Sequence, residues 1–383
     1  MNADLNDCKL GIWNETIPGF YLDDLGISNY AKIQQALMHD FPLGNEGLQK
    51  WKEVVQNIKK AGANQTYDCI IGVSGGTDSS YLLHLAKEWG LRPLAVNLDN
   101  GWNSDIAVRN IHDMTKALEI DLETYVVDYE EMKDILKSYL LAGLPWLDNP
   151  TDQAIKAILY RYARKEGVKT VLIGTDFRSE GKQPSEWTYG DYKQLKYVHK
   201  EFGKVKRKTY PENTFMMTFW SAYFKKIKLV SPFNYLPYDK KSAQDFLERN
   251  YNWKYYGEHH HENLFTKWVI SYWMYAKFNI DKRIITYSAQ VLNGKLSRDE
   301  AKRITAEKPY KPEAIENDTA YVLKKLGLSK EDYLKAWNQP TKTFKDYPSY
   351  FESINKYSGL IKILARYVLK TKPKLFYEME NRK

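Results

Sequence analysis

Cysteine is scarce in this sequence. Only two occur among 383 residues, Cys8 and Cys69. Cys69 stands inside an apolar run typical of a buried strand, so the two thiols do not form a redox motif at short spacing. Two cysteines also cannot build the disulfide framework of a small secreted protein. We therefore expect a reducing compartment.

Long apolar runs and a leader pattern are missing as well. No stretch reaches the roughly 18 uninterrupted apolar residues that a membrane-spanning helix requires. The start of the chain, MNADLNDCKLGIWNE, lacks a basic segment followed by an apolar run. We expect a cytoplasmic protein that has no membrane partner.

The net charge of +9 does not point to nucleic acid. Lysine and arginine stand beside aspartate and glutamate along the helical segments, and the most basic stretch is the C-terminal tail, a pattern typical of a solvated surface. Thirty tyrosines and eleven tryptophans concentrate after about residue 190. No glycine-spaced aromatic strand motif accompanies them, so we interpret most of them as core and interface aromatics.

The chain divides into three regions. Residues 1–65 form a front segment with an amphipathic helix at residues 45–60, residues 66–240 alternate strands with helices, and residues 241–383 are dominated by helical patterns. The predicted strands are residues 67–73, 92–99, 122–128, 168–174 and 227–233, and the helices between them residues 78–90, 106–118 and 151–167. The predicted C-terminal helices are residues 241–250, 262–278, 297–304, 315–327 and 358–371.

Strands that alternate with helices at this spacing predict an α/β fold with a doubly wound parallel sheet, because each parallel connection needs a crossover. A helical C-terminal region follows the sheet. Ligands are then expected at the carboxyl ends of the strands.

The strongest local signal is the hexapeptide Ser74-Gly75-Gly76-Thr77-Asp78-Ser79, which directly follows a predicted strand and precedes a helix. Two glycines let the backbone turn tightly around an anion, and the helix that follows adds its positive N-terminal end. The hydroxyls of Ser74 and Ser79 can add donors. Asp78 has two roles open to it, capping the helix and holding Mg²⁺ near the phosphates.

No lysine stands where a Walker A loop would place one, and the dinucleotide fingerprint Gly-x-Gly-x-x-Gly is absent. S-G-G-x-D-S instead resembles the PP-loop of adenylate-forming enzymes such as GMP synthetase, argininosuccinate synthetase and the tRNA thiolation enzymes. Those enzymes bind ATP through its β,γ-pyrophosphate and release pyrophosphate. The resemblance implies that ATP and Mg²⁺ are used here and that Ser74, Gly75, Gly76, Thr77, Asp78 and Ser79 bind the nucleotide.

Polar residues follow the second and fourth predicted strands, where a doubly wound sheet brings them toward this loop. Asp99 is suited to contact adenosine and equally suited to a simple turn. Gly174, Asp176 and Glu180 suggest a backbone contact and Mg²⁺ ligands beside a triphosphate, against the alternative of a solvated loop. We expect catalytic roles for Asp78, Asp176 and Glu180, with Asp78 and Glu180 as the Mg²⁺ ligands.

Two further groups are candidates for binding the second substrate. Asp152 begins a helix and is either a cap or a substrate ligand. The run Glu258-His259-His260-His261-Glu262 invites a metal assignment, but adjacent residues cannot all face one ion and the spacing His-Glu-x-x-His is absent. We expect His259, His260, His261 and Glu262 to contact a phosphorylated or carboxylated substrate.

Beyond the loop, the stretches YDCIIGVSGGTDSSYLLHLAKEWGLRPLAVNLDNGWNSDIAVRNI, PTDQAIKAI, IGTDFRSEG, YYGEHHHENLFTKW and DKRIITYSAQVLNGKLSRDEA are similar to the N-acetyl sugar amidotransferases of surface-polysaccharide biosynthesis. The similarity runs from about Cys8 to Ala301. Enzymes of that family convert an acetamido group to an acetamidino group with ATP and ammonia. The resemblance places Asp99 and Gly174 at the nucleotide and makes Glu180 a metal or substrate ligand.

This chain departs from the family's pattern at its N-terminal cysteines. Two Cys-x-x-Cys pairs suited to zinc are usual in that family. In this chain the first pair keeps Cys8 but has Gly11 at the position of its second cysteine, and the second pair is replaced by Ser28 and Ala31. One thiol cannot hold zinc, so we expect no zinc site. The family's Thr-Asp-His-Ala is Thr-Asp-Gln-Ala around Asp152, which leaves the identity of the sugar open.

The nitrogen source is expected to be a separate protein. A glutaminase needs a cysteine nucleophile with a histidine partner, and neither Cys8 nor Cys69 is suited to that role. We expect ammonia from a separate glutaminase subunit, an acetamido sugar or nucleotide sugar as substrate, and no nucleic-acid partner; the oligomeric state stays open. The rival interpretation is an RNA-modifying PP-loop enzyme, while a non-catalytic binding subunit would require a broken loop.

Overall fold

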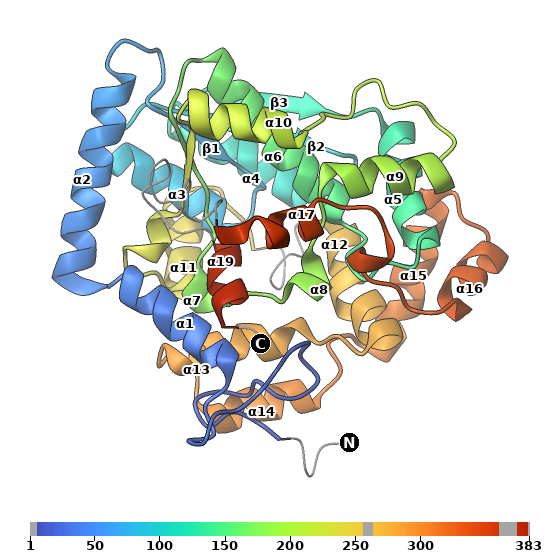
Figure 1. Cartoon of the computed structure of the whole chain (residues 1–383). Helices are drawn as coiled ribbons and strands as arrows, with labels where there is room; N and C mark the ends of the chain where they lie inside the picture. Colours follow the sequence, from blue (N-terminus) through green and yellow to red (C-terminus); the bar gives the residue numbers. More distant parts are fainter. Residues whose placement is uncertain (1–5, 256–262, 360–373, 382–383) are drawn as a thin grey trace.

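The computed structural model describes residues 6–255, 263–359 and 374–381 (Figure 1). Its centre is one sheet of five strands in the order β3-β2-β1-β4-β5. All neighbouring strands pair in parallel. The predicted doubly wound α/β class is therefore confirmed. The strands are β1 (Cys69–Gly72), β2 (Pro93–Asp99), β3 (Leu122–Val126), β4 (Thr170–Leu172) and β5 (Lys228–Val230).

Helices cover both faces of this sheet, and successive side chains of β1 are buried against one face and then the other. Ile70 packs into one hydrophobic cluster while Cys69 and Ile71 pack into the other, because successive side chains of a strand point to opposite faces. The face of Ile70 is covered by α6 (Asn149–Lys165). The face of Ile71 is covered by helices α2 (Gly44–Gly62), α3 (Thr77–Glu88), α4 (Asp105–Ala117) and α11 (Lys240–Asn250).

The order of the strands creates a switch point beside β1. The chain builds outward from β1 through β2 to β3 and then returns to place β4 on the opposite side of β1. Crossovers on the two sides therefore diverge at the carboxyl ends of β1 and β4. Crevices at such points are where open α/β sheets bind ligands.

Helices connect and flank the sheet along the rest of the chain. Helices α1 (Asn29–Asp40), α5 (Tyr129–Leu141) and α13 (Lys282–Leu292) lie outside the segments assigned to helices from sequence. The remaining elements before β5 are α7 (Phe177–Glu180), α8 (Ser185–Thr188), α9 (Tyr192–Phe202), α10 (Phe215–Phe219) and the π-helix η1 (Trp220–Phe224).

The C-terminal part is helical, as the sequence predicts, and Figure 1 shows α13 and α14 at the bottom of the view and α15 and α16 at its right. The predicted helix at residues 262–278 begins as α12 and continues as a π-helix. The predicted helix at residues 358–371 lies almost wholly outside the described residues. The elements are η2 (Pro232–Asn234), α12 (Leu264–Trp268), η3 (Val269–Lys277), α14 (Arg298–Ala306), α15 (Pro312–Leu326), α16 (Lys330–Asn338), η4 (Phe344–Asp346), α17 (Phe351–Lys356) and α19 (Lys374–Glu380).

The front segment packs against α13 and α14. The thiol of Cys8 accepts a hydrogen bond from the backbone of Ser28 at 3.2 Å, and the guanidinium of Arg298 donates to the carbonyl oxygens of Cys8 and Gly11. Of the apolar residues expected to hold this segment, Ile12, Trp13 and Ile17 are buried, Phe20 and Tyr21 are half-buried, and Leu25 is 67% exposed.

The aromatic residues after position 190 serve both the core and the surface. Trp253, Trp268 and Trp273 are almost completely buried. In α10 and η1, by contrast, only Ser221 is buried, and most of the large side chains face outward. Among the described residues, no helix combines the length and the apolar character needed to cross a membrane.

Candidate functional site

The loop between β1 and α3 depends on a glycine at position 75. Gly75 has a φ of +76°, and a Cβ on it would lie 2.1 Å from the carbonyl oxygen of Ala107 in α4. Both the left-handed backbone and the contact with another backbone exclude larger residues. The side chains of Asn110 and Trp253 donate hydrogen bonds to the carbonyl oxygen of Gly75 at 3.1 and 3.3 Å. Two separate segments of the chain, α4 and the segment that contains Trp253, therefore hold the loop in place.

The two serines of the loop brace it from within. The Oγ of Ser79 accepts from the backbone N–H of Ser74 at 3.2 Å and donates to the carbonyl oxygen of Gly76 at 3.3 Å. The Oγ of Ser74 accepts from the N–H of Gly76. Thr77 is fully buried, and its hydroxyl accepts from Gln244. Because the first N–H groups of a helix have no partner inside the helix, the start of α3 is suited to bind an anion.

Asp78 does not cap α3. The N-cap is Gly76, which offers no side chain, and the carboxylate of Asp78 accepts from the hydroxyl of Tyr238 and lies 3.5 Å from Nζ of Lys240. Gly174 passes directly over this turn, since a Cβ on it would lie 3.0 Å from the backbone of Asp78. The structure therefore brings Gly174 and Asp78 together, as the sequence predicts.

The carboxylates of Asp176 and Glu180 both accept hydrogen bonds from backbone N–H groups of their own segment. Asp176 caps the short helix α7 by accepting from the N–H of Arg178 at 2.9 Å, and Glu180 accepts from the N–H of Asp176 at 3.1 Å. Burial raises the pKa of Asp176. In residues 6–255, 263–359 and 374–381, no three His, Cys, Asp or Glu side chains gather into a group that could hold a metal ion. Asp78, which lies at the loop, fits the single carboxylate that Mg²⁺ needs beside phosphate oxygens better than Glu180 does.

A cavity of about 470 Å³ opens at the carboxyl ends of β1, β2 and β4. Ser74 lines it at the loop, Asn97 and Asn100 line it from β2 and the turn that follows, and Thr175 lines it after β4. Its apolar wall comes from Val73, Val96, Leu98, Ile155, Ile158, Leu159 and Ile173. An apolar wall that carries a few polar groups is typical of a small-molecule site.

Asp99 does not line this cavity. Its carboxylate accepts from the N–H of Gly101 at 2.9 Å and so shapes the turn after β2. The neighbouring amide of Asn100 faces the cavity and donates to the hydroxyl of Thr151 at 3.1 Å. Of the two roles considered for Asp99, the geometry favours the turn.

The cavity extends along α6 to a second group of polar residues. Leu159 approaches the end of β1, because a Cβ on Gly72 would lie 3.3 Å from its methyl groups. Asp152 lies two turns earlier in α6, about 10 Å away along the helix axis, and its carboxylate accepts from the indole N–H of Trp146 at 2.7 Å. Nζ of Lys282 lies 4.2 Å from the ring centroid of Trp146.

Sequence reasoning missed Trp146, Asp148 and Lys282. Asp148 is buried and accepts from the hydroxyl of Thr266. Desolvation lowers the pKa of Lys282 to about 8, against the opposing effect of nearby Asp152, Glu180 and Asp148. Lys282 falls in one of the stretches that carry the family resemblance, which is the one sequence signal that could have indicated it.

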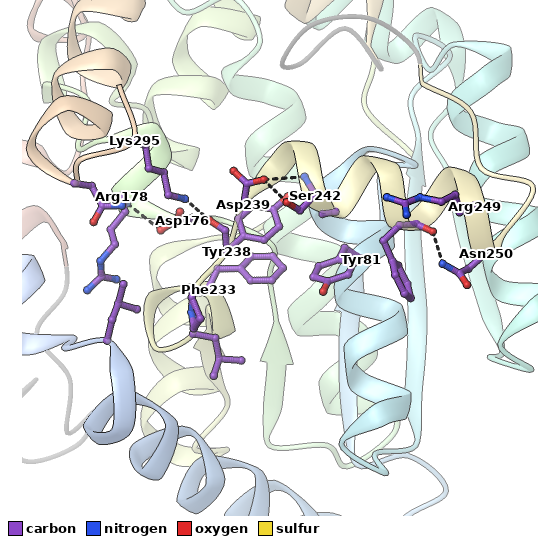
Figure 2. Close-up of a pocket in the computed structure, with 16 residues that line it drawn as sticks. Tyr81, Asp176, Arg178, Phe233, Tyr238, Asp239, Ser242, Arg249, Asn250 and Lys295 are labelled. Carbon is purple, nitrogen blue, oxygen red and sulfur yellow. Dashed lines mark hydrogen bonds between the residues drawn. The ribbon is translucent and has the colours of Figure 1, made fainter. Parts of the chain in front are cut away.

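A larger cavity of about 700 Å³ lies on the other side of the segment after β4. Asp176 lines this larger cavity, whereas the adjacent residue Thr175 lines the smaller one. Figure 2 shows Tyr238 stacked on Phe233 in its wall, with Lys295 directed toward the backbone of Tyr238. No loop residue from Ser74 to Ser79 lines it. Of these two cavities, the smaller one is therefore the candidate site for a ligand bound at the loop.

The predicted substrate ligands His259, His260, His261 and Glu262 lie outside the described residues, so the structure does not place them. The chain resumes at Asn263, which lines the smaller cavity. Its side chain caps α12 by accepting from the N–H groups of Phe265 and Thr266.

Comparisons with known proteins find similarity over parts of the chain. A curated relative, the uncharacterized protein MJ1599 of Methanocaldococcus jannaschii, is 31% identical over 142 residues, which is 36% of this chain and 48% of that protein. The chain thus spans about half the length of this relative.

Three solved structures resemble this chain only weakly. NMN synthetase from Francisella tularensis has 14% identity and a TM-score of 0.27, and the match covers 60% of this chain and 94% of that chain. A predicted tRNA methyltransferase subunit from Methanocaldococcus jannaschii has 13% identity and a TM-score of 0.28, with 47% of this chain and 75% of that chain covered. NH3-dependent NAD synthetase from Campylobacter jejuni has 14% identity and a TM-score of 0.28, with 53% of this chain and 83% of that chain covered. At these TM-scores the likenesses carry no argument about function.

The C-terminal part matches a family model. Residues 262–359 match the model described as "LPS biosynthesis protein WbpG-like, C-terminal domain". The matched segment supplies Asn263, Thr266 and Lys282 to the wall of the smaller cavity. This part of the chain is similar to the C-terminal domain of the WbpG-like proteins of LPS biosynthesis, in agreement with the resemblance of the chain to the N-acetyl sugar amidotransferases.

Proposed function

We propose that this chain is an ATP-dependent, AMP-forming amidotransferase that converts the acetamido group of an N-acetylated sugar or nucleotide sugar to an acetamidino group. The observation that carries the proposal is the cavity at the switch point of the sheet. It joins the anion-binding loop at Ser74 to residues of a WbpG-like domain, among them Lys282.

The proposed placement of ATP follows the lining of this cavity. The adenosine lies against Leu98, Ile158 and Leu159, and the β,γ-pyrophosphate lies at the start of α3, where the loop amides and the helix end favour negative charge. Gly174 permits the close approach of the β4 end to that turn. The α-phosphorus then faces the part of the cavity formed by Asp152, Trp146 and Lys282.

The reaction would proceed in two displacements. The acetamide oxygen of the sugar attacks the α-phosphorus, the bond to the bridging oxygen breaks, and pyrophosphate leaves to give an O-adenylated imidate. Ammonia then attacks the imidate carbon, the carbon–oxygen bond breaks, and AMP leaves with the former acetamide oxygen. One proton is lost to solvent as ammonia and the acetamido nitrogen become the two nitrogens of a protonated amidine. Adenylation is needed because an amide oxygen is a poor leaving group.

The chain's own residues would contribute charge and alignment. The loop amides and the start of α3 stabilise charge that builds on pyrophosphate. Mg²⁺, when bound, would neutralise phosphate charge, and Asp78 is the carboxylate placed to hold it. Tyr238 and Lys240 orient that carboxylate.

Ammonia is proposed to come from a separate glutaminase subunit. Both thiols are buried, and burial raises the pKa of Cys69, so a nucleophilic thiolate is disfavoured at that residue. The sulfur of Cys8 already accepts a hydrogen bond from Ser28. An RNA-modifying PP-loop enzyme is the alternative, and the cavity of about 470 Å³ favours a small acceptor over it.

We expect ATP to be cleaved between its α and β phosphates. Purified protein incubated with ATP, Mg²⁺, ammonium chloride and N-acetylated nucleotide sugars should form AMP and pyrophosphate in equal amounts, measured by ³¹P NMR. A reaction without sugar is the control for idle hydrolysis. Stoichiometric ADP and phosphate would contradict the proposed function.

A further inference from the structure

Lys282 is an unusual cation within the cavity. It is the first residue of α13, and the preceding residue, Asp281, caps that helix. Within the described ranges 6–255, 263–359 and 374–381, its Nζ forms no hydrogen bond and no ion pair; its close contact is the face of Trp146 at 4.2 Å. The side chain of Lys282 is half-buried, and charged groups that are withdrawn from water are mostly paired, because the withdrawal is costly.

The side chain beneath Lys282 is itself fixed. Trp146 is 7% exposed, and its indole N–H donates to the carboxylate of Asp152 at 2.7 Å. The ring therefore presents one face to the ammonium group in a defined orientation, and a cation over an indole face is attracted by the ring's quadrupole. Asp152 is on this evidence a positioning residue, which holds the ring that supports Lys282.

Three carboxylates lie near enough to act on Lys282 electrostatically without pairing with it. Asp152, Glu180 and Asp148 each favour its charged form, while desolvation opposes it, and the resulting pKa of about 8 keeps the side chain mostly protonated at neutral pH. Asp152 and Asp148 have other partners, the indole of Trp146 and the hydroxyl of Thr266. A charged ammonium group is thus held at the cavity wall with its hydrogen-bond donors directed to no described acceptor.

We infer that Lys282 binds a phosphoryl oxygen of the ligand in this cavity. The inference rests on the proposed function for the identity of the ligands, since both ATP and a nucleotide sugar carry phosphoryl groups. Two sources share this chemistry: the α-phosphate of the adenine nucleotide and the phosphate attached to the sugar. In this arrangement, residues of the α/β part bind the nucleoside. Lys282, from the segment that matches the WbpG-like family, supplies a positive charge to the phosphoryl group, because the loop from Ser74 to Ser79 contains no lysine or arginine.

Binding measurements with phosphorylated and unphosphorylated pairs test this role and separate the two sources. Calorimetric titration of the full chain compares AMP with adenosine, and N-acetylglucosamine 1-phosphate with N-acetylglucosamine. For each pair, the affinity ratio of the phosphorylated to the unphosphorylated ligand is compared. In Lys282→Met we expect this affinity ratio to fall about 10- to 100-fold for one of the two pairs, as for loss of a hydrogen bond to a charged group. Adenosine and N-acetylglucosamine should bind as before. Lys282→Arg, which keeps the charge, should restore part of the loss.

The matched control is Lys325→Met. Nζ of Lys325 lies 4.5 Å from the ring centroid of Trp102, and this lysine does not line the cavity, so its loss removes a similar cation–ring contact without the proposed ligand contact. Thermal unfolding of each variant reports its folding, and Lys282→Gln provides a second neutral variant if the methionine variant is unstable.

The outcomes separate this inference from the proposed function. If AMP no longer binds more tightly than adenosine, Lys282 contacts the nucleotide. If the sugar phosphate no longer binds more tightly than the sugar, Lys282 contacts the acceptor. Either result supports the inference even if no AMP-forming turnover is found. Equal affinities of wild type and Lys282→Met for both phosphorylated ligands would overturn it. So would a loss of the same factor for adenosine as for AMP, and for both sugars alike, because that is the result of a purely structural role.

Discussion

Gly75→Ala should strongly weaken nucleotide binding while leaving the chain folded. The new Cβ would lie 2.1 Å from the carbonyl oxygen of Ala107, and backbone cannot yield as a flexible side chain can. The loop must therefore shift away from α4, and a displacement of about 1 Å at such a site can reduce the rate about 100-fold. We expect ATP affinity and AMP formation each to fall by about this factor or more, measured by calorimetry and by product release.

Gly294→Ala is the matched control. Gly294 has a φ of +71°, close to that of Gly75, but a Cβ on it would meet no atom within 4 Å. Both substitutions carry the same left-handed strain, about 1 to 2 kcal/mol, and only one displaces the loop. Nucleotide affinity close to wild type in Gly75→Ala, or an equal loss in Gly294→Ala, would show that the loop does not bind ATP.

Ammonium chloride should support amidine formation, and glutamine alone should not. The isolated chain offers two thiols, both buried, and burial raises the pKa of the Cys69 thiol, so a thiolate that attacks glutamine is not available there. With a competent sugar substrate, mass spectrometry should detect the acetamidino product with ammonium and only background with glutamine.

Cys8→Ala is the variant that separates the two sources of nitrogen. Ammonium-dependent turnover should persist in it, since Cys8 lies in the front segment and does not line the cavity. Glutamine-dependent turnover by the wild-type chain that disappears in Cys8→Ala would show that the nitrogen chemistry is contained in this chain.

The position of the loop could be predicted because local rules determine it. A buried strand, two glycines and a helix follow one another in sequence, so the site from Ser74 to Ser79 needs no tertiary information. Gly174 was also foreseeable, since parallel strands end at the same edge of the sheet. The alternation of strands and helices predicts a parallel sheet but not its strand order, β3-β2-β1-β4-β5, which only the structure shows.

The far end of the cavity could not be predicted in this way. Trp146 and Lys282 are 136 positions apart in the numbering, and neither belongs to a motif with a chemical meaning of its own. From the sequence, Asp152 is either a cap or a substrate ligand; in the structure it lines the cavity and accepts a hydrogen bond from the indole of Trp146. Asp176 and Glu180 have the residue types of a metal site, but the short helix α7 uses their carboxylates for its own backbone.

The fate of the acetamide oxygen tests the central claim most directly. An N-acetylated sugar substrate labelled with ¹⁸O in its acetamide carbonyl is incubated with ATP, Mg²⁺ and ammonium, and the AMP formed is examined by mass spectrometry. If the oxygen attacks the α-phosphorus and leaves with it, each AMP should carry one ¹⁸O and pyrophosphate none. Unlabelled AMP accompanying amidine formation, or label found in water or in free phosphate, would contradict O-adenylation of the acetamido group.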